Sequence, residues 1–446
     1  MAVVLACEAS VSRTDSYLDC LTSGLSIEDF SCGALKIAKA KIAEVDRFRA
    51  ENVARKDLKS RIATGGSFGG YFLWDTAFAA IWAARLPKGT LPAVESLDNF
   101  YALADENGFI NREYTANGVR VWGPSHPNAF APPLLSWAEM ELFGHGHTDV
   151  VRLKAVFPKL RRHHDFCKAH YRRPDGLYFG DQLGCGMDDM RRYPHGMTTN
   201  ELMNSGGIPF TVDSIGPESK QFIHAAFLRD VVPDHYWNRQ MGWIDMSAQM
   251  ALDAWMLAEM AERIGRANDA RNLRAEHAEL AAAINQYCWS DELGFYGDYY
   301  DGKVMPRKSA AAFWVLLAKV ATPDRAAIVR DTLMDERFFL RPNPFPTLSA
   351  DDPDYQPEKG YWNGSSWPPT TYVAIRGLRE YGFEKEAEMS ARRYYEANLA
   401  LFRKYGTVFE NISPEQSDHA KERAQPDFCG WGALAPVALP VDFGWR

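Results

Sequence analysis

The chain has 446 residues, of which 46% are hydrophobic and 13% aromatic, so it is long enough for one large domain or for two to three ordinary ones. Its formal net charge of -8 gives no basic surface and argues against a nucleic-acid partner. The seven cysteines include no Cys-x-x-Cys pair, so we expect reduced thiols and a cytoplasmic location.

Two further patterns agree with that location. Residues 1–7 form a short apolar run without a basic region, so we expect no secretion signal. No apolar stretch reaches the roughly 18 residues that a membrane-spanning helix needs, so we expect no membrane partner.

Apolar residues recur at helical spacing along most of the chain, and strand-like alternation is nearly absent. The predicted helices cover about 31–58, 70–86, 91–105, 130–143, 149–172, 245–264, 267–289, 308–321, 324–335, 368–381 and 384–405, with one more near the C-terminus. Residues 176–179 and 294–297 are candidates for small hairpins. The fold class is therefore all-α.

Three predicted helices end in an apolar residue followed by glycine, at Gly144, Gly265 and Gly382. Glycine suits a left-handed C-cap, and short links make neighbouring helices antiparallel. About twelve helices in pairs predict a toroid of six hairpins, an (α/α)6 barrel; the alternative is an irregular all-α domain.

The expected organisation is an N-terminal segment and helix (1–59) that packs on a catalytic barrel domain (60–446). The least helical stretch, 191–242, follows two consecutive aspartates. A long irregular segment in a compact domain is often a functional lid, although a well-packed structural insertion fits the same pattern.

Four short segments, far apart in the chain, combine carboxylates with aromatic or glycine neighbours. They are 74–75, 186–189, 361–367 and 409–411. Flat aromatic faces stack on sugar rings, carboxylates bind hydroxyl groups, and two carboxylates can cleave a glycosidic bond. A fold that gathers these segments would form a carbohydrate site.

Asp188 is the candidate general acid. Glycines before it allow close approach to a ligand, and the apolar Met187 and Met190 can raise its pKa by reducing solvation. The alternative is a turn with a surface ion pair between Asp189 and Arg191 or Arg192.

Glu410 is the candidate second carboxylate. It lies inside an apolar run, so it is expected to be at least partly buried and to need a partner or a ligand. The alternative is a buried glutamate that caps a helix or pairs with an arginine.

The remaining candidates bind substrate, and each has a simpler explanation. Asp75 after Trp74 can cap a helix, the aromatic residues of 361–367 can be core, and Arg112 with Glu113 can be a loop ion pair. The full candidate set comprises Trp74, Asp75, Arg112, Glu113, Arg192, Tyr361, Trp362, Asn363, Trp367 and Trp431. The histidines lack metal-ligand spacing, so no metal is expected, and no phosphate loop or dinucleotide fingerprint occurs.

These residues resemble glycoside hydrolase family 63, which includes processing α-glucosidase I and bacterial mannosylglycerate and glucosylglycerate hydrolases. The matching stretches are 108–113 with 131–133, 185–192, 361–367, and 409–412 with Gly430 and Trp431. The resemblance covers about 60–446 and implies an (α/α)6 barrel and an inverting mechanism, with Asp188 as general acid and Glu410 as general base.

The chain departs from the family pattern at several positions. Asn363 stands in place of arginine, Ser365 and Arg191 in place of prolines, and Phe68 and Phe72 where the glycerate-releasing enzymes carry tyrosine and tryptophan. These changes leave the sugar and the leaving group open.

We therefore expect an inverting glycoside hydrolase that acts on a short α-glucoside or α-mannoside and requires no cofactor. A sugar isomerase or epimerase on the same toroid is the alternative, and it would need a histidine pair in the pocket. A catalytically inactive sugar-binding protein is the third reading. The oligomeric state is not indicated by the sequence.

Overall fold

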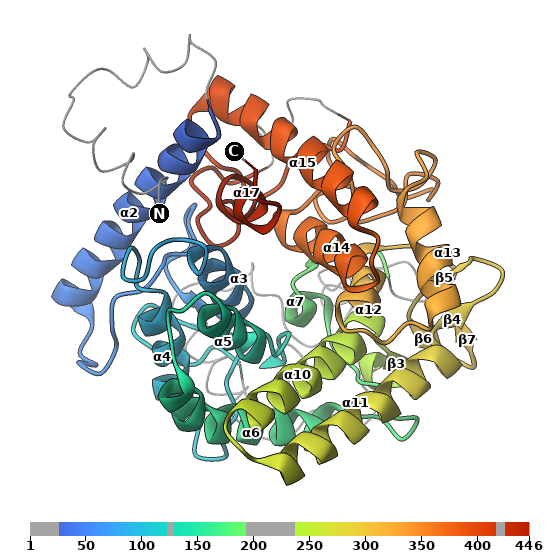
Figure 1. Cartoon of the computed structure of the whole chain (residues 1–446), viewed down its shortest axis with the longest axis horizontal. Helices are drawn as coiled ribbons and strands as arrows, with labels where there is room; N and C mark the ends of the chain where they lie inside the picture. The colour runs from blue at the N-terminus through green and yellow to red at the C-terminus, as the bar shows by residue number, and fades with distance from the viewer. Residues whose placement is uncertain (1–25, 123–128, 193–236, 416–423, 446) are drawn as a thin grey trace.

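The computed structural model describes residues 26–122, 129–192, 237–415 and 424–445. Within them the chain is mostly helical, and the helices form two concentric layers (Figure 1). This arrangement confirms the predicted all-α class.

The inner layer is a closed ring. Its successive neighbours contact one another from α3 round to η5, and η5 contacts α3 again. The members are α3 (Leu73–Ala83), α5 (Leu135–Gly144), α10 (Ile244–Arg263), α12 (Trp314–Leu317), α14 (Pro368–Glu380) and the π-helical η5 (Leu434–Ala438), which α17 (Leu439–Asp442) continues. Every residue of α3 is buried, as expected for a helix with neighbours on all sides.

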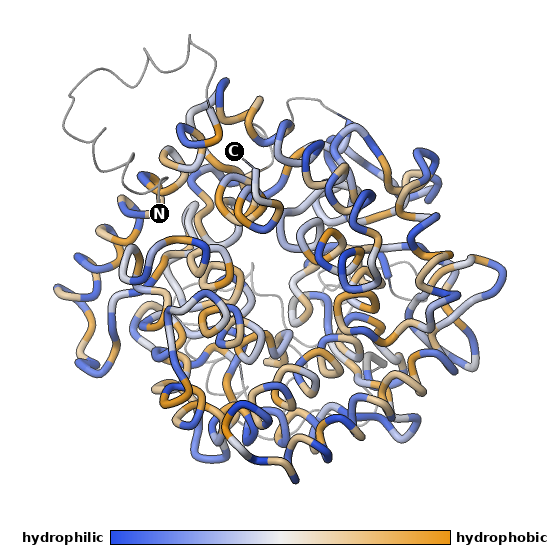
Figure 2. Tube along the Cα trace, in the orientation of Figure 1, coloured by the Kyte–Doolittle hydropathy of each residue, from blue (hydrophilic) through white to orange (hydrophobic). Residues whose placement is uncertain are grey.

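The outer layer packs on this ring. It contains α2 (Ile27–Asn52), α4 (Ala93–Leu103), α6 (Val150–Tyr171), α11 (Ala267–Tyr287), α13 (Pro323–Leu333) and α15 (Glu384–Tyr405). The outer helices alternate hydrophobic and hydrophilic residues along the tube, whereas the inner ones are more uniformly hydrophobic (Figure 2). Six inner and six outer segments among the described residues give the (α/α)6 arrangement predicted from the sequence.

Short strands and turns connect the helices. β1 (Tyr71–Phe72) pairs with β2 (Glu113–Tyr114), and β4 (Trp289–Ser290) pairs with β5 (Phe295–Tyr296). A three-stranded sheet joins β3 (Met241–Gly242), β6 (Tyr299–Tyr300) and β7 (Lys303–Val304). The remaining short helices are α7 (Gln182–Cys185), η3 (Trp237–Gln240) and η4 (Ala310–Phe313).

Two of the three predicted glycine caps are confirmed. Gly265 and Gly382 have φ of 80° and 77°, in the left-handed region. The prediction at Gly144 is wrong, because α5 includes this residue and the left-handed conformation falls on Gly146, where φ is 78°.

Three further expectations concern the proposed lid, membrane-spanning helices and the cysteines. Residues 193–236 of the proposed lid lie outside the described residues. No helix of the described chain is long and apolar enough to span a membrane. Four cysteines are free and buried, but Cys32 is disulfide-bonded, contrary to the expectation that all thiols are reduced.

Candidate active site

The loop that carries Asp188 begins at α7, which lies at the centre of the ring (Figure 1). Gly186 has φ of 83°, and a Cβ atom added there would lie 3.4 Å from the Trp74 ring. Glycine therefore allows the loop to turn while its backbone lies against the indole.

Hydrogen bonds fix the same loop to the segment that starts at Tyr361. The Trp362 amide donates to the Asp189 carboxylate at 3.0 Å. The Asn363 side chain donates to the Asp189 carbonyl at 2.7 Å and accepts from the Arg191 amide at 2.9 Å. Asp189 and Asn363 thus hold the backbone that directly follows Asp188.

Arg192 ends the loop in a buried ion-pair network. Its guanidinium donates to both oxygens of Asp245, at 2.7 and 2.9 Å, and to both oxygens of Asp298, at 2.6 and 2.8 Å. A fifth donor contact reaches the Cys185 sulfur at 3.5 Å. These contacts use all five N–H donors, so we interpret Arg192 as an anchor of the loop and not as a sugar ligand.

Glu410 is 3% exposed and has hydrogen-bond donors at both carboxylate oxygens. The Tyr361 hydroxyl donates to Oε1 at 2.8 Å, and the Gln425 amide donates to Oε2 at 3.3 Å. The Trp431 indole also donates to the Glu410 carbonyl at 2.8 Å. These contacts hold the carboxylate in place and favour its charged form.

Asp75 and Trp74 lie in the first turn of α3, opposite two glycines of other segments. A Cβ atom on Gly430 would lie 3.2 Å from Cβ of Asp75. Asp75 is 7% exposed and Trp74 is 5% exposed. The buried Nε1 of Trp74 has no hydrogen-bond partner in the described structure, so this donor is available to a ligand.

Arg112 supplies positive charge beside these acids. Its carbonyl accepts from the Leu73 amide at 3.0 Å, so it lies next to the start of α3. Its guanidinium pairs with Glu113 at 2.7 Å, and Glu113 also accepts from the Trp122 indole at 3.3 Å. Arg112 and Glu113 therefore form the ion pair that the sequence suggested. They also lie next to the candidate site.

The tryptophans of the 361–367 segment pack mainly on one another. Trp362 and Trp367 are each 1% exposed and stack with ring centroids 3.6 Å apart. Trp367 contacts Tyr361 edge-on at 4.7 Å and Trp431 at 5.9 Å. The burial and stacking of Trp362 and Trp367 agree with the alternative of core packing. Trp367 contacts Tyr361 and Trp431, which both donate to Glu410.

The three acids near the centre influence one another's protonation. Burial raises the pKa of Asp188 to about 7, with Arg112 opposing the shift and the charges of Asp189 and Glu410 adding to it. Burial raises the pKa of Asp75 well above its ordinary range, and the charges of Glu410 and Asp188 add to that shift. The three carboxyl groups thus share one desolvated region.

Burial also raises the pKa of Glu410, while the hydrogen bonds from Tyr361 and the Gln425 amide lower it. The pKa of Glu410 thus stays above its ordinary value, and the two hydrogen bonds limit the rise. Asp188, with a pKa raised to about 7, can carry a proton near neutral pH, and Glu410 differs from it in having donors that favour its ionised form, as suits a pair of acids with unequal roles in general acid–base chemistry.

The structure brings together half of the twelve residues proposed from the sequence. They come from five segments and contact or electrostatically influence one another: Trp74, Asp75, Arg112, Asp188, Tyr361 and Glu410. The sequence did not reveal the backbone of Gln425 or the anchors Asp245 and Asp298. A backbone donor carries no side-chain signal, and the anchors come from distant elements. The described residues contain no cluster suited to a metal ion.

Known proteins resemble this chain over most of its length. The family model for the mannosylglycerate hydrolase MGH1-like glycoside hydrolase domain matches residues 70–428. A crystal structure of the family 63 mannosylglycerate hydrolase from Thermus thermophilus, in complex with Tris and D-glycerate, superposes with a TM-score of 0.68 at 18% identity. The superposition covers 92% of this chain and 99% of that one.

Curated relatives are longer than the matched region. An uncharacterized protein of Borreliella burgdorferi is 23% identical over 338 residues, covering 75% of this chain and 62% of the relative. A periplasmic trehalase of Salmonella paratyphi C is 24% identical over 354 residues, covering 73% of this chain and 57% of the relative. The chain thus spans about three fifths of the length of these relatives.

Proposed function

Because the chain belongs to the mannosylglycerate hydrolase MGH1-like family of glycoside hydrolases, we propose that it hydrolyses a short α-glucoside or α-mannoside with inversion at the anomeric carbon. The observation that carries the proposal is the unequal environment of two central acids. Asp188 has a pKa raised to about 7, and Glu410 accepts two hydrogen bonds that favour its ionised form.

In this proposal Asp188 is the general acid. The protonated carboxyl donates its proton to the glycosidic oxygen as the bond to the anomeric carbon breaks. The loop contacts of Asp189 and Asn363 fix its position, and Arg112 limits how far its pKa rises.

Glu410 is the general base. Its carboxylate takes a proton from a water molecule, whose oxygen forms the new bond to the anomeric carbon on the face opposite the leaving group. Tyr361 and the Gln425 amide hold both carboxylate oxygens, so the base is oriented before substrate arrives.

Asp75 and Trp74 are the proposed ligands of the sugar hydroxyls. A protonated Asp75 both donates and accepts hydrogen bonds, and the buried Nε1 of Trp74 can donate to a hydroxyl oxygen. Arg112 and Tyr361 complete the polar wall. The other candidates position these residues and the acid loop through the contacts described above: Glu113, Trp362, Asn363, Trp367, Trp431 and Arg192.

The substrate classes to compare follow from the relatives. Mannosylglycerate is named for the Thermus thermophilus enzyme, and trehalose for the Salmonella enzyme. We propose a small α-linked compound of one of these two types, a glycosylglycerate or an α-linked disaccharide. Release of reducing sugar from mannosylglycerate, glucosylglycerate and trehalose distinguishes them and tests the isomerase alternative, which releases no second product.

The roles of the two acids are tested with substrates that differ in leaving group. Asp188→Asn and Glu410→Gln are each expected to lower kcat on a natural glycoside by about 10²- to 10⁴-fold. On a 4-nitrophenyl α-glycoside, whose leaving group needs little protonation, Asp188→Asn should recover most of its activity and Glu410→Gln should not. Equal loss on both substrates in Asp188→Asn, or near-normal turnover of the natural glycoside in either folded variant, would refute the assignment.

A further inference from the structure

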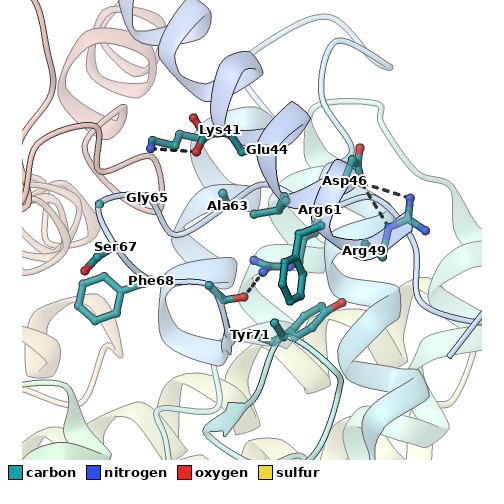
Figure 3. Close-up of a pocket in the computed structure, with 15 residues that line it drawn as sticks. Lys41, Glu44, Asp46, Arg49, Arg61, Ala63, Gly65, Ser67, Phe68 and Tyr71 are labelled. Atoms are coloured by element: carbon teal, nitrogen blue, oxygen red, sulfur yellow. Dashed lines mark hydrogen bonds and ion pairs between the residues drawn. The ribbon is translucent and has the colours of Figure 1, made fainter. Parts of the chain in front are cut away.

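A cavity of about 260 Å³ lies between α2 and the segment that leads into β1 (Figure 3). Its lining comes from the α2 residues between Lys41 and Arg49, from residues between Arg61 and Tyr71, and from Ala116. Neither Asp188 nor Glu410 belongs to the lining, so the cavity is separate from the proposed catalytic acids.

Arg61 is the buried cation of this cavity. Its residue is 6% exposed, and its guanidinium lies over the Tyr71 ring, with its central carbon 4.3 Å from the ring centroid. One donor reaches the Gly69 carbonyl at 2.7 Å. A carbonyl and an aromatic face hold the guanidinium in place but do not neutralise its charge.

No carboxylate of the described residues forms an ion pair with Arg61. Burial accordingly lowers the pKa of Arg61, and the nearby Tyr71 and Asp46 oppose that shift only in part. A buried charge without a counter-ion is costly, and folded proteins usually pair it.

The other charges of the cavity wall are already matched. Lys41 pairs with Glu44 at 3.1 Å, and Arg49 pairs with Asp46 at 3.2 Å. Asp46 also accepts from the Ser60 hydroxyl at 2.6 Å. Two acids and two bases therefore cancel, and Arg61 leaves the wall with one positive charge.

We propose that this cavity binds a small organic anion, with its carboxylate or phosphate group paired to Arg61. The guanidinium fork suits the two oxygens of either group. The ring of Phe68 in the same wall, 37% exposed, offers an apolar surface for the remainder of the ligand.

A chain of aromatic contacts connects the wall of this cavity to Glu410. Phe68 contacts Phe72 and Phe428 edge-on, with ring centroids 5.6 and 5.9 Å apart. Phe428 in turn packs on Trp431 at 4.4 Å, and Trp431 donates to the Glu410 carbonyl. A bound anion would thus contact the segment that directly precedes Trp74 and Asp75.

The test is calorimetric titration of the full chain with inorganic phosphate, with L-lactate, and with glycerol as a neutral control. Saturable binding of phosphate or lactate, without binding of glycerol, is expected, and the anion that binds more tightly identifies the class. Arg61→Gln should weaken that binding by about 10- to 100-fold, because hydrogen bonds to charged groups carry that much affinity.

Two variants make the test specific. Arg49→Gln removes the same charge from the wall but leaves Arg61, so it should weaken binding by a smaller factor than Arg61→Gln. Arg61→Lys keeps the charge and loses the fork, so it should weaken binding even if Arg61→Gln does not fold. Absence of saturable binding to both anions, unchanged affinity in Arg61→Lys, or equal losses in Arg61→Gln and Arg49→Gln would overturn the proposal.

Discussion

At the scale of single residues, two carboxylic acids differ because their surroundings differ. Both are desolvated, and desolvation alone would keep both protonated. Glu410 accepts from Tyr361 and from the Gln425 amide, whereas Asp188 is influenced by the negative charges of Asp189 and Glu410. The hydrogen bonds at Glu410 offset part of its desolvation, whereas the charges beside Asp188 add to the rise in its pKa.

The pH dependence of kcat/KM should reflect this difference. Glu410 must be ionised, so activity should rise with pH through a pKa above 4.5; Asp188 must be protonated, so activity should fall through about 7. Tyr361→Phe removes a hydrogen bond to the ionised form of Glu410, so the acidic limb should move to higher pH.

A matched control exists for this variant. The Tyr355 hydroxyl donates to Glu415 at 2.8 Å, so Tyr355→Phe removes the same kind of bond away from Glu410 and should leave the profile unchanged. An acidic limb that does not move in Tyr361→Phe, or moves equally in both variants, would contradict the role given to Glu410.

At the scale of elements, the acid loop is held by other segments at two places after Asp188. The turn after Tyr361 holds the backbone around Asp189, and Arg192 ties the end of the loop to α10 through Asp245 and to the strand region through Asp298. The position of the proposed acid therefore depends on residues that contact no substrate.

Arg192→Gln should lower the free energy of unfolding by about 3–5 kcal/mol, because it leaves Asp245 and Asp298 buried without their cation. Urea unfolding measures the change. Arg337→Gln is the control: it breaks an exposed pair with Asp335, so stability should stay the same. Equal stability of Arg192→Gln and the wild type would contradict the anchoring role.

The positions of the helices were largely predictable from the sequence, because the apolar residues of each helix recur at helical spacing. The first and last residues of the helices were harder to predict. α2 begins four residues before the predicted start, since Ser26 and Asp29 form a capping box whose sequence signal is short. α5 runs through Gly144 because a second glycine, Gly146, takes the left-handed turn.

The candidate site was predictable in its residue types but not in every role. Carboxylates beside aromatic residues were visible in the sequence, and the fold brings several of them together. Whether Trp362 faces a ligand or another ring, and whether Arg192 faces a sugar or two aspartates, depends on segments far away in the chain. Such contacts have no local sequence signal.

At the scale of the whole molecule, the closed ring joins the two ends of the described chain. The outer helix α2 contacts η5, and the Ser31 hydroxyl donates to the Pro436 carbonyl at 2.5 Å. Phe30 is fully buried against Tyr395 and Phe402, with centroids 5.5 and 4.9 Å away. The first described helix thus shares the core of the barrel.

Phe30→Ala should therefore destabilise the whole barrel by about 3–5 kcal/mol while leaving the pH profile of hydrolysis unchanged. Phe48→Ala, on the same helix but 44% exposed, should cost much less. Thermal unfolding gives both values. If α2 were a separate unit, Phe30→Ala would unfold that helix alone, in an early transition, and leave the main transition unmoved.

The central claim is a single displacement with Asp188 as acid and Glu410 as base, and the anomer formed first tests it most directly. Proton NMR of hydrolysis in progress distinguishes the two anomers before they equilibrate. A glycosylglycerate should give the β-sugar first, because water attacks the face opposite the leaving group, and trehalose should give equal amounts of β-glucose and α-glucose, the second being its leaving group. Initial release of the α-sugar alone would mean net retention and would contradict the mechanism.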